Sequence, residues 1–306
     1  MVRFPADPLA DWLHGQLGVD LLARIPVGGG CIHSAWCLRT SGDNRLFVKT
    51  NRAETLPLLE AEAEGLAALA RVAPAALRIP EPLALGLAGE EAVLVLPWLE
   101  LARGGGAAES WAECGANLAR LHRLSLQPEG AAKITQGFGW SRDNFIGASP
   151  QCNGWREAWS VFFAECRLQP QLVGLARQGQ PMRGAERLLE HLPAWLAGHA
   201  PQPCLVHGDL WSGNAALLAG GGACLFDPAV HRGDREVDLA MARLFGGFPE
   251  AFFKGYEEEW PLPGGWRERV TLYNLYHLLN HANLFGGGYG KQAQKVIDSL
   301  LGLQIN

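Results

Sequence analysis

The residues with the clearest chemical pattern lie between His207 and Asp227. Residues 207–214 read HGDLWSGN, and the apolar pair Leu225-Phe226 leads directly into Asp227. The order His, one residue, Asp, four residues and Asn, with a second Asp shortly afterwards, is typical of catalytic loops that transfer the γ-phosphate of ATP. The spacing therefore predicts phosphoryl transfer to a hydroxyl group.

Each residue type suits a part of that chemistry. Asp209 is the expected catalytic residue, because a carboxylate accepts the proton of the attacking hydroxyl and orients its oxygen toward the γ-phosphate. Asn214 and Asp227 offer hard oxygen ligands and are the expected metal ligands for the Mg²⁺ that accompanies ATP. A short hairpin between these two residues would fix both relative to Asp209.

The remaining parts of an ATP site occur upstream in the expected order. Three glycines between two strands would cover the phosphates with backbone N–H groups. Lys49, at the end of an apolar run, would bind the α- and β-phosphates, with Glu62 on the next helix as its ion-pair partner. Residues 95–99 would form the hinge that contacts adenine. The expected cofactor-binding residues are Gly28, Gly29, Gly30, Lys49, Glu62, Pro97, Trp98 and Leu99.

Taken singly, most of these features have an ordinary structural explanation. Three glycines usually form a turn, a lysine after a strand is usually solvated, and a lone glutamate is usually a helix-surface charge. The octapeptide 207–214 is harder to explain in this way, and all parts follow one another in kinase order between residues 28 and 228. This order favours an ATP-dependent kinase.

Hydrophobic periodicity divides the chain into a strand-rich first third and a helix-rich remainder. Three strands are expected within 25–50 and two more near 83–85 and 93–96, with a helix at 58–70 between them. Short apolar runs at 204–206 and 224–226 flank the catalytic loop. The other expected helices are 109–124, 155–168, 183–199, 236–245, 249–260, 266–285 and 291–301. We expect an α+β, protein-kinase-like bilobal fold with an antiparallel-sheet N-lobe (1–98) and a mainly helical C-lobe (99–306).

Composition bears on several other classes of protein. The chain has 306 residues, of which 48% are hydrophobic and 19% charged, and its net charge is -5. No long basic run is present, so we expect no nucleic-acid partner. The longest apolar run is too short for a membrane span. The seven scattered cysteines contain no CxxC pair and indicate reduced thiols, so we expect a cytoplasmic protein.

Several longer segments carry a resemblance to a known family. They are GGGCI (28–32), FVKTN (47–51), EAEAEGLAAL (60–69), NLARLHR (117–123), DNFIG (143–147), NGWREAWSVFFAECRLQPQL (153–172), LVHGDLWSGN (205–214), FDPAV (226–230), DREVDLAMARLFGGFP (234–249) and YNLYHLLNHANLFGGGY (273–289). In these segments the chain resembles the fructosamine-3-kinase, or ketosamine-3-kinase, family, a branch of the aminoglycoside-phosphotransferase-like kinases.

The resemblance implies a substrate and residues that bind it. Family members phosphorylate the third-carbon hydroxyl of a ketosamine, a sugar joined to an amine, and the product decomposes to release the amine. The implied partner is a small-molecule or protein-bound glycated amine, with the sugar left open. Trp211 would stack on the sugar or pack between the lobes, and Asn153 and Trp155 would edge the sugar pocket. Asp238 and His207 are expected to anchor the catalytic loop. The protein is expected to be a monomer or weak homodimer.

Two departures from protein kinases concern regulation. Gly208 precedes the catalytic Asp where regulated protein kinases carry Arg, and Pro228 rather than Phe follows Asp227. We therefore expect a site that is assembled without phosphorylation. Cys31 follows the three glycines directly, and both a redox-sensitive thiol and an ordinary strand residue fit that position.

Two other functions stay open. The catalytic loop fits kinases of other small hydroxyl substrates, such as aminoglycosides, choline or homoserine, although NGWREAW (153–159) and LFGGFP (244–249) favour the ketosamine branch. A nucleotide-binding pseudokinase module is the third reading. It is disfavoured because every expected catalytic, metal-binding and phosphate-binding side chain is retained.

Overall fold

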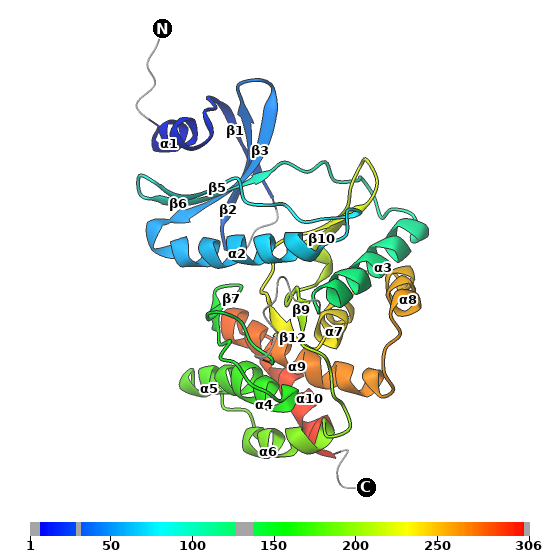
Figure 1. Cartoon of the computed structure of the whole chain (residues 1–306). Helices are drawn as coiled ribbons and strands as arrows, with labels where there is room; N and C mark the ends of the chain where they lie inside the picture. Colours follow the sequence, from blue (N-terminus) through cyan, green and yellow to red (C-terminus); the bar gives the residue numbers. More distant parts are fainter. Residues whose placement is uncertain (1–6, 29–31, 127–136, 303–306) are drawn as a thin grey trace.

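The computed structural model describes residues 7–28, 32–126 and 137–302, which form an α+β fold of two lobes (Figure 1). The N-terminal lobe is built on an antiparallel five-stranded sheet. Its strands, in spatial order, are β1 (Leu21–Val27), β2 (Ser34–Thr40), β3 (Asn44–Arg52), β6 (Glu91–Pro97) and β5 (Ala84–Ala88). The helices α1 (Pro8–Leu17) and α2 (Leu56–Val72) pack on this sheet. The expected strands and the expected helix near residues 58–70 are confirmed.

Helix α2 has a buried face that carries a charged residue. Leu59, Leu66 and Leu69 are at most 1% exposed, and Glu62 on the same face is 9% exposed. The 3.6-residue period brings these positions to one side of the helix, against the sheet. A glutamate at such a position requires a partner, because an unpaired buried carboxylate is strongly unfavourable. The partner is described below.

The C-terminal lobe is mainly helical. Its helices are α3 (Ala108–Leu124), α4 (Trp159–Phe162), α5 (Gln169–Arg177), α6 (Ala185–Trp195), α7 (Glu236–Leu244), α8 (Glu250–Glu259), α9 (Trp266–Phe285) and α10 (Tyr289–Gly302), with short 3₁₀ turns η1 (Ala53–Thr55, in the N-lobe) and η3 (Ser212–Asn214). A π-helical segment, η2 (Phe163–Leu168), joins α4 to α5. Within the described residues, no helix is long and apolar enough to cross a bilayer.

Small sheets hold the catalytic loop. Strand β10 (Ala215–Leu217) forms a hairpin with β11 (Ala223–Leu225), and β11 pairs in parallel with β4 (Leu77–Arg78). Strand β9 (Cys204–Val206) pairs with β12 (His231–Gly233), and β7 (Asn144–Ile146) pairs with β8 (Ser149–Gln151). The two apolar runs that flank the catalytic loop therefore lie in different sheets. The hairpin expected between the two metal ligands is present.

The lobes share a core. One apolar cluster joins Leu66 of α2 and Leu94 of β6 to Leu118 of α3 and Phe252 of α8. Strand β4 also joins the first third of the chain to the C-lobe hairpin. Apolar packing and the β4–β11 hydrogen bonds both connect the two parts of the chain. A division of the chain into lobes between residues 98 and 99 therefore stays a prediction.

Two expected helices differ from those observed. The helix expected at 155–168 begins at Trp159, because residues 152–155 have no regular secondary structure and the backbone of Arg156 pairs with that of Phe138. Trp159 is 3% exposed and its ring packs against Phe138 and Tyr273. The helix expected at 183–199 is shorter, covering Ala185–Trp195.

Candidate active site

A single pocket of about 850 Å³ lies between the lobes and contains most of the expected site residues. Its lining includes Gly28, Lys49, Glu62, Pro97, Trp98, Leu99, Asp209, Trp211, Asn214 and Asp227. Gly29, Gly30 and Cys31 lie outside the described residues. Residues that are up to 199 positions apart in the sequence thus line one cavity, as expected for the parts of a kinase site.

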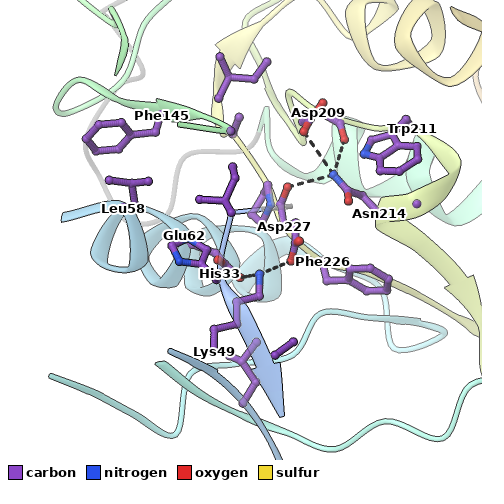
Figure 2. Close-up of a pocket in the computed structure, with 18 of the residues that line it drawn as sticks. His33, Lys49, Leu58, Glu62, Phe145, Asp209, Trp211, Asn214, Phe226 and Asp227 are labelled. Atoms are coloured by element: carbon purple, nitrogen blue, oxygen red, sulfur yellow. Dashed lines mark hydrogen bonds and ion pairs between the residues drawn. The ribbon is translucent and has the colours of Figure 1, made fainter. Parts of the chain in front are cut away.

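Lys49 is the centre of a buried charge cluster. Its Nζ donates to Glu62 Oε1 at 2.7 Å and to Asp227 Oδ1 at 2.5 Å, and the residue is only 6% exposed (Figure 2). Burial alone would lower the pKa of Lys49, but the two carboxylates outweigh it and raise the pKa above its ordinary value. Lys49 therefore stays charged, and its ammonium group lines the interlobe pocket.

The backbone of Asp227 is held in an unusual conformation. Its φ is 57°, one of two positive φ values among described non-glycine residues. Left-handed backbone is disfavoured for residues with a side chain, and such strain is concentrated at functional sites. Asp227 lies shortly after the β10–β11 hairpin in the sequence, and its carboxylate contacts Lys49 from that position.

Asn214 joins the catalytic loop to the loop that carries Asp227. Its Nδ2 donates to the backbone oxygen of Asp209 at 2.9 Å, to Asp209 Oδ2 at 3.4 Å and to the backbone oxygen of Asp227 at 3.3 Å (Figure 2). Because the amide nitrogen is engaged in this way, the amide oxygen is the atom left to coordinate a cation. Asn214 and Asp227 thus supply oxygen donors that fit Mg²⁺.

The carboxyl group of Asp209 has an altered acidity. Burial and the nearby charge of Asp227 raise the pKa of Asp209 to about 7, against a smaller lowering by the Asn214 hydrogen bond. A base with this pKa is matched to proton transfer near neutral pH. The acidity suits the catalytic role that the sequence predicts for Asp209.

A buried network anchors the catalytic loop. Asp238 of α7 accepts hydrogen bonds from the backbone N–H of His207 at 2.7 Å and of Gly208 at 2.8 Å. His207 is fully buried, and its Nε2 donates to the carbonyl of Phe226 at 3.0 Å. The anchoring expected of Asp238 and His207 is confirmed. His207 also links the catalytic loop to the strand end that precedes Asp227.

The same network explains the glycine before the catalytic Asp. Gly208 has φ 81°, and a Cβ built there would lie 2.1 Å from the carbonyl oxygen of Ala229. A side chain cannot occupy that space. The absence of an arginine at this position therefore follows from backbone packing in this fold.

Helix α2 is tied to the C-lobe close to Glu62. Glu64 accepts hydrogen bonds from Trp140 Nε1 at 2.9 Å and Ser141 Oγ at 3.1 Å, and pairs with Arg142 Nε at 2.5 Å. These contacts join α2 to the segment before β7. They hold the helix that carries the partner of Lys49.

Two expected substrate residues lie outside the pocket lining. Asn153 is 1% exposed; its Oδ1 accepts from Arg167 Nη2 at 2.8 Å and its Nδ2 donates to Asn144 Oδ1 at 2.7 Å. The ring of Trp155 packs over Gly139, 2.9 Å from the position of a built Cβ. Asn153 therefore supports Asn144, which does line the pocket. Contrary to the sequence prediction, Asn153 and Trp155 lie outside the pocket lining.

Sequence reasoning did not find several residues that line the pocket. Aromatic side chains from β7, the α7–α8 connection, α9 and α10 also line the pocket, as does His33, which lies near Lys49 (Figure 2). These aromatic residues are Phe145, Phe245, His281, Phe285 and Tyr289. The ring of His281 lies 4.9 Å from that of Phe245 and 5.1 Å from that of Tyr289. His277, one turn earlier on α9 than His281, is buried and outside the lining.

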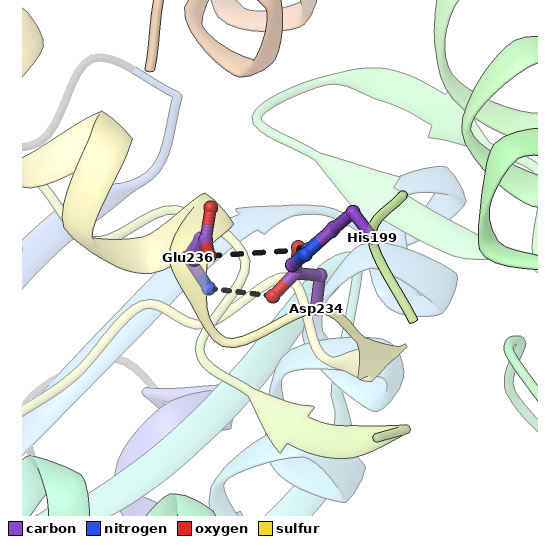
Figure 3. A group of neighbouring side chains, drawn as sticks. All are labelled: His199, Asp234 and Glu236. Atoms are coloured by element: carbon purple, nitrogen blue, oxygen red, sulfur yellow. Dashed lines mark hydrogen bonds and ion pairs between the residues drawn. The ribbon is translucent and has the colours of Figure 1, made fainter. Parts of the chain in front are cut away.

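A second cluster, of His199, Asp234 and Glu236, has ligand atoms close enough for a metal ion (Figure 3). Its acidic groups already have partners. Arg269 donates to both oxygens of Glu236 at 2.8 and 2.7 Å, and Tyr273 and His199 donate to Asp234 Oδ2 at 2.7 and 2.5 Å. The cluster is therefore an ion-pair and hydrogen-bond network that fixes the start of α7, the helix of Asp238.

Phosphotransferases with protein-kinase-like folds place their nucleotide between two lobes in this way, against a lysine–glutamate pair and a nearby aspartate. Comparison with known proteins narrows that class. The model of the fructosamine kinase family matches residues 9–303, and the chain belongs to this family.

Relatives and a solved structure agree with that assignment. A probable ketoamine kinase of Synechocystis sp. is 46% identical over 91% of this chain and 90% of its own length. The chloroplastic protein-ribulosamine 3-kinase of Arabidopsis thaliana is 35% identical over 98% of this chain and 90% of its own length. A crystal structure from Thermobifida fusca, provisionally named a fructosamine-3-kinase, is 30% identical and superposes with a TM-score of 0.81, covering 97% of this chain and 99% of that chain.

Proposed function

We propose that the protein is an ATP-dependent kinase that phosphorylates the 3-hydroxyl of ketosamines, the fructosamine- or ribulosamine-type adducts of amines. The observation that carries this proposal is the convergence of Lys49, Asp209, Asn214 and Asp227 on one interlobe pocket. Family membership supports it, as do the names of relatives that act as ketoamine and ribulosamine kinases.

The nucleotide has a defined place in this proposal. The hinge residues Pro97, Trp98 and Leu99 contact the adenine. The Lys49 ammonium group, which Glu62 holds in position, binds phosphate oxygens. Asn214 and Asp227 hold Mg²⁺, which supplies electrostatic stabilisation of the phosphate charges when bound. Asp227, which pairs with Lys49 in this structure, would supply a carboxylate oxygen to the metal.

Asp209 acts on the acceptor. Its carboxylate takes the proton from the sugar hydroxyl as the hydroxyl oxygen attacks the γ-phosphorus, and the bond to the β–γ bridging oxygen breaks to release ADP. Asn214 and Asp238 hold the catalytic loop in position for this transfer. The 3-phosphate then promotes decomposition of the adduct, so the expected outcome is deglycation of a small-molecule or protein-bound amine.

The acceptor end of the pocket favours a ketosamine over a polycationic aminoglycoside. Among the described lining residues the carboxylates are Glu62, Glu100, Asp209 and Asp227. Glu62 and Asp227 are paired with Lys49, Glu100 is paired with Arg45 near the hinge, and Asp209 is the proposed base. The other lining residues are mostly apolar, and aromatic side chains, including Trp211, are prominent among them. Aromatic faces suit a sugar and a single ammonium group, whereas a polycation requires several free carboxylates.

We further propose that the protein acts in the cytoplasm as a monomer or weak homodimer. Reduced thiols are consistent with this, since the described cysteines are free. Phosphorylation is not required in this proposal, because Gly208 leaves no arginine to receive an activation-loop phosphate and Glu64 already ties α2 to the C-lobe. Activity that depended on a phosphorylated Ser or Thr would contradict this part.

The decisive experiment is a kinase assay with Mg-ATP and a panel of fructosyl-, ribulosyl- and erythrulosyl-lysine, with an aminoglycoside and choline as comparison acceptors. Phosphoryl transfer to the 3-hydroxyl of at least one ketosamine, strongly reduced in Asp209→Asn, is the expected result. Transfer only to the comparison acceptors would replace the ketosamine assignment. Nucleotide binding without transfer to any of them would favour a binding module.

A further inference from the structure

His33 lies on the pocket wall without an assigned role. It precedes β2, and Figure 2 shows its imidazole beside Glu62 and near the Lys49 side chain. The strand register explains this position. Ala35 pairs with Lys49, and side chains alternate between the faces of a sheet, so residue 33 falls on the face of Lys49 and opposite Asn51.

The surrounding hydrogen bonds determine which ring nitrogen carries the proton. Asn51 Oδ1 accepts from the backbone N–H of Arg52 at 2.8 Å, and Asn51 Nδ2 donates to the carbonyl of Ile32 at 2.9 Å. These two contacts fix the orientation of the amide. The same Nδ2 lies 3.1 Å from His33 Nδ1, so Nδ1 is the acceptor and the proton of the neutral ring is on Nε2.

The ring is neutral before nucleotide binds. Burial and the charge of Lys49 lower the pKa of His33 to about 4, against a smaller opposing effect of Asp227. Nε2 is therefore an N–H donor, and no described residue hydrogen bonds to it. Lys49 has three donors, of which Glu62 and Asp227 occupy two. The cavity wall thus holds an Nε2–H without a partner among the described residues, and Lys49 keeps one donor for a ligand.

We propose that His33 is a phosphate-binding residue whose Nε2–H donates to a phosphate oxygen of the bound nucleotide, with Asn51 fixing the tautomer. This inference rests on the proposed kinase function and adds a side-chain contact to it. A hydrogen bond to a charged oxygen strengthens with the charge of the acceptor. The contribution of His33 should therefore appear with nucleotides that carry phosphates and be absent for adenosine.

Binding of adenosine, ADP and a non-hydrolysable ATP analogue, each with Mg²⁺, to the full-length protein tests the proposal by calorimetry. His33→Leu should weaken binding of ADP and the analogue about 10- to 100-fold, the size expected for a lost hydrogen bond to a charged group. Adenosine binding should change less than about twofold. His33→Gln, whose amide N–H reaches the position of Nε2, should restore most of the affinity. His191→Leu is the matched control, since His191 lies on α6 against Trp195 and outside the pocket.

The outcomes separate this inference from the kinase proposal. A wild-type protein that binds neither ADP nor the analogue would contradict the proposed function itself. If the wild type binds and His33→Leu binds equally well, the phosphate contact is refuted while the kinase proposal stands. An equal loss for adenosine and ADP, or an equal loss in His33→Leu and His33→Gln, would also overturn the contact, because ring packing rather than hydrogen bonding would then explain the effect.

Discussion

At the nucleotide end of the pocket, charged side chains from three separate segments meet within hydrogen-bonding distance, as Lys49, Glu62 and Asp227 do. The rest of the lining, where the acceptor is proposed to bind, includes aromatic side chains such as Phe245, His281 and Tyr289. Phosphate and metal chemistry permit few residue types, whereas a sugar is recognised by shape and apolar faces that many side chains provide. Substitutions at the two ends should therefore affect different kinetic constants.

The largest effect is expected where the two ends meet. Asp209→Asn should lower kcat for the ketosamine by up to about 10⁴-fold, because the base and its orienting charge are both lost. The KM for ATP should remain within a few-fold. Burial raises the pKa of Asp209 to about 7, so ionisation destabilises the fold as pH rises through that value. The variant should consequently have an equal or higher melting temperature than wild type at pH 8, which rules out unfolding as the cause of inactivity.

The next largest effect is expected for Lys49→Met, and this effect should be confined to the nucleotide. Loss of the ammonium group should lower kcat/KM for ATP by about 10²- to 10³-fold, the usual effect of removing a positioned electrostatic group. The KM for the ketosamine should change little. The variant leaves Glu62 and Asp227 without their shared partner, so Lys49→Arg, which keeps the charge, serves as the stability control. A rise in ketosamine KM equal to the loss for ATP would show that the two ends are not independent.

The sequence predicted the charged nucleotide-binding residues better than the rest of the pocket. Lys49, Glu62 and Asp227 were found because a short motif and its order specify them. The register that places His33 beside Lys49 depends on strand pairing, and no motif marks it. Asn153 and Trp155 were assigned to the pocket because they lie in a family segment, but that segment is irregular before Trp159, and Asn153 is buried against Arg167.

The overall architecture was easier to predict from the sequence than the contacts that join the lobes. Alternation and helical periodicity predicted the five-stranded sheet and the long helices, since these patterns are local. The pairing of β4 with β11 and the contacts of Glu64 with residues 140–142 connect distant segments. No local pattern encodes such contacts.

The pH dependence of the reaction should locate the base. Asp209 acts in its ionised form, and its pKa is raised to about 7 by burial and by Asp227. The kcat/KM for the ketosamine should therefore rise about tenfold per pH unit below pH 7 and level off above it. Asp209→Asn should lose this dependence in its residual activity. A wild-type profile that is flat between pH 5 and 8 would refute Asp209 as the base.

At the acceptor end, Trp211→Leu should raise the KM for the ketosamine about 3- to 10-fold, the range expected for a lost aromatic contact with the sugar. Trp211 is 39% exposed and lines the pocket next to Asp209. The KM for ATP should be unchanged, and Trp211→Phe should recover much of the loss. If Trp211 instead packs between the lobes, Trp211→Leu should lower the melting temperature and affect both substrates equally.

The smallest effect tests whether α2 is positioned from outside the pocket. Glu64→Gln removes the charge that pairs with Arg142 while keeping an acceptor for Trp140 and Ser141. Because both charged side chains are partly exposed, at 47% and 32%, the ion pair should contribute little, and kcat should fall by about two- to fivefold. Glu60→Gln on the same helix is the matched control, since no described contact involves its carboxylate. A larger loss in Glu64→Gln would mean that the lysine partner on α2 depends on this interlobe contact, and that the nucleotide end is assembled partly by the acceptor lobe.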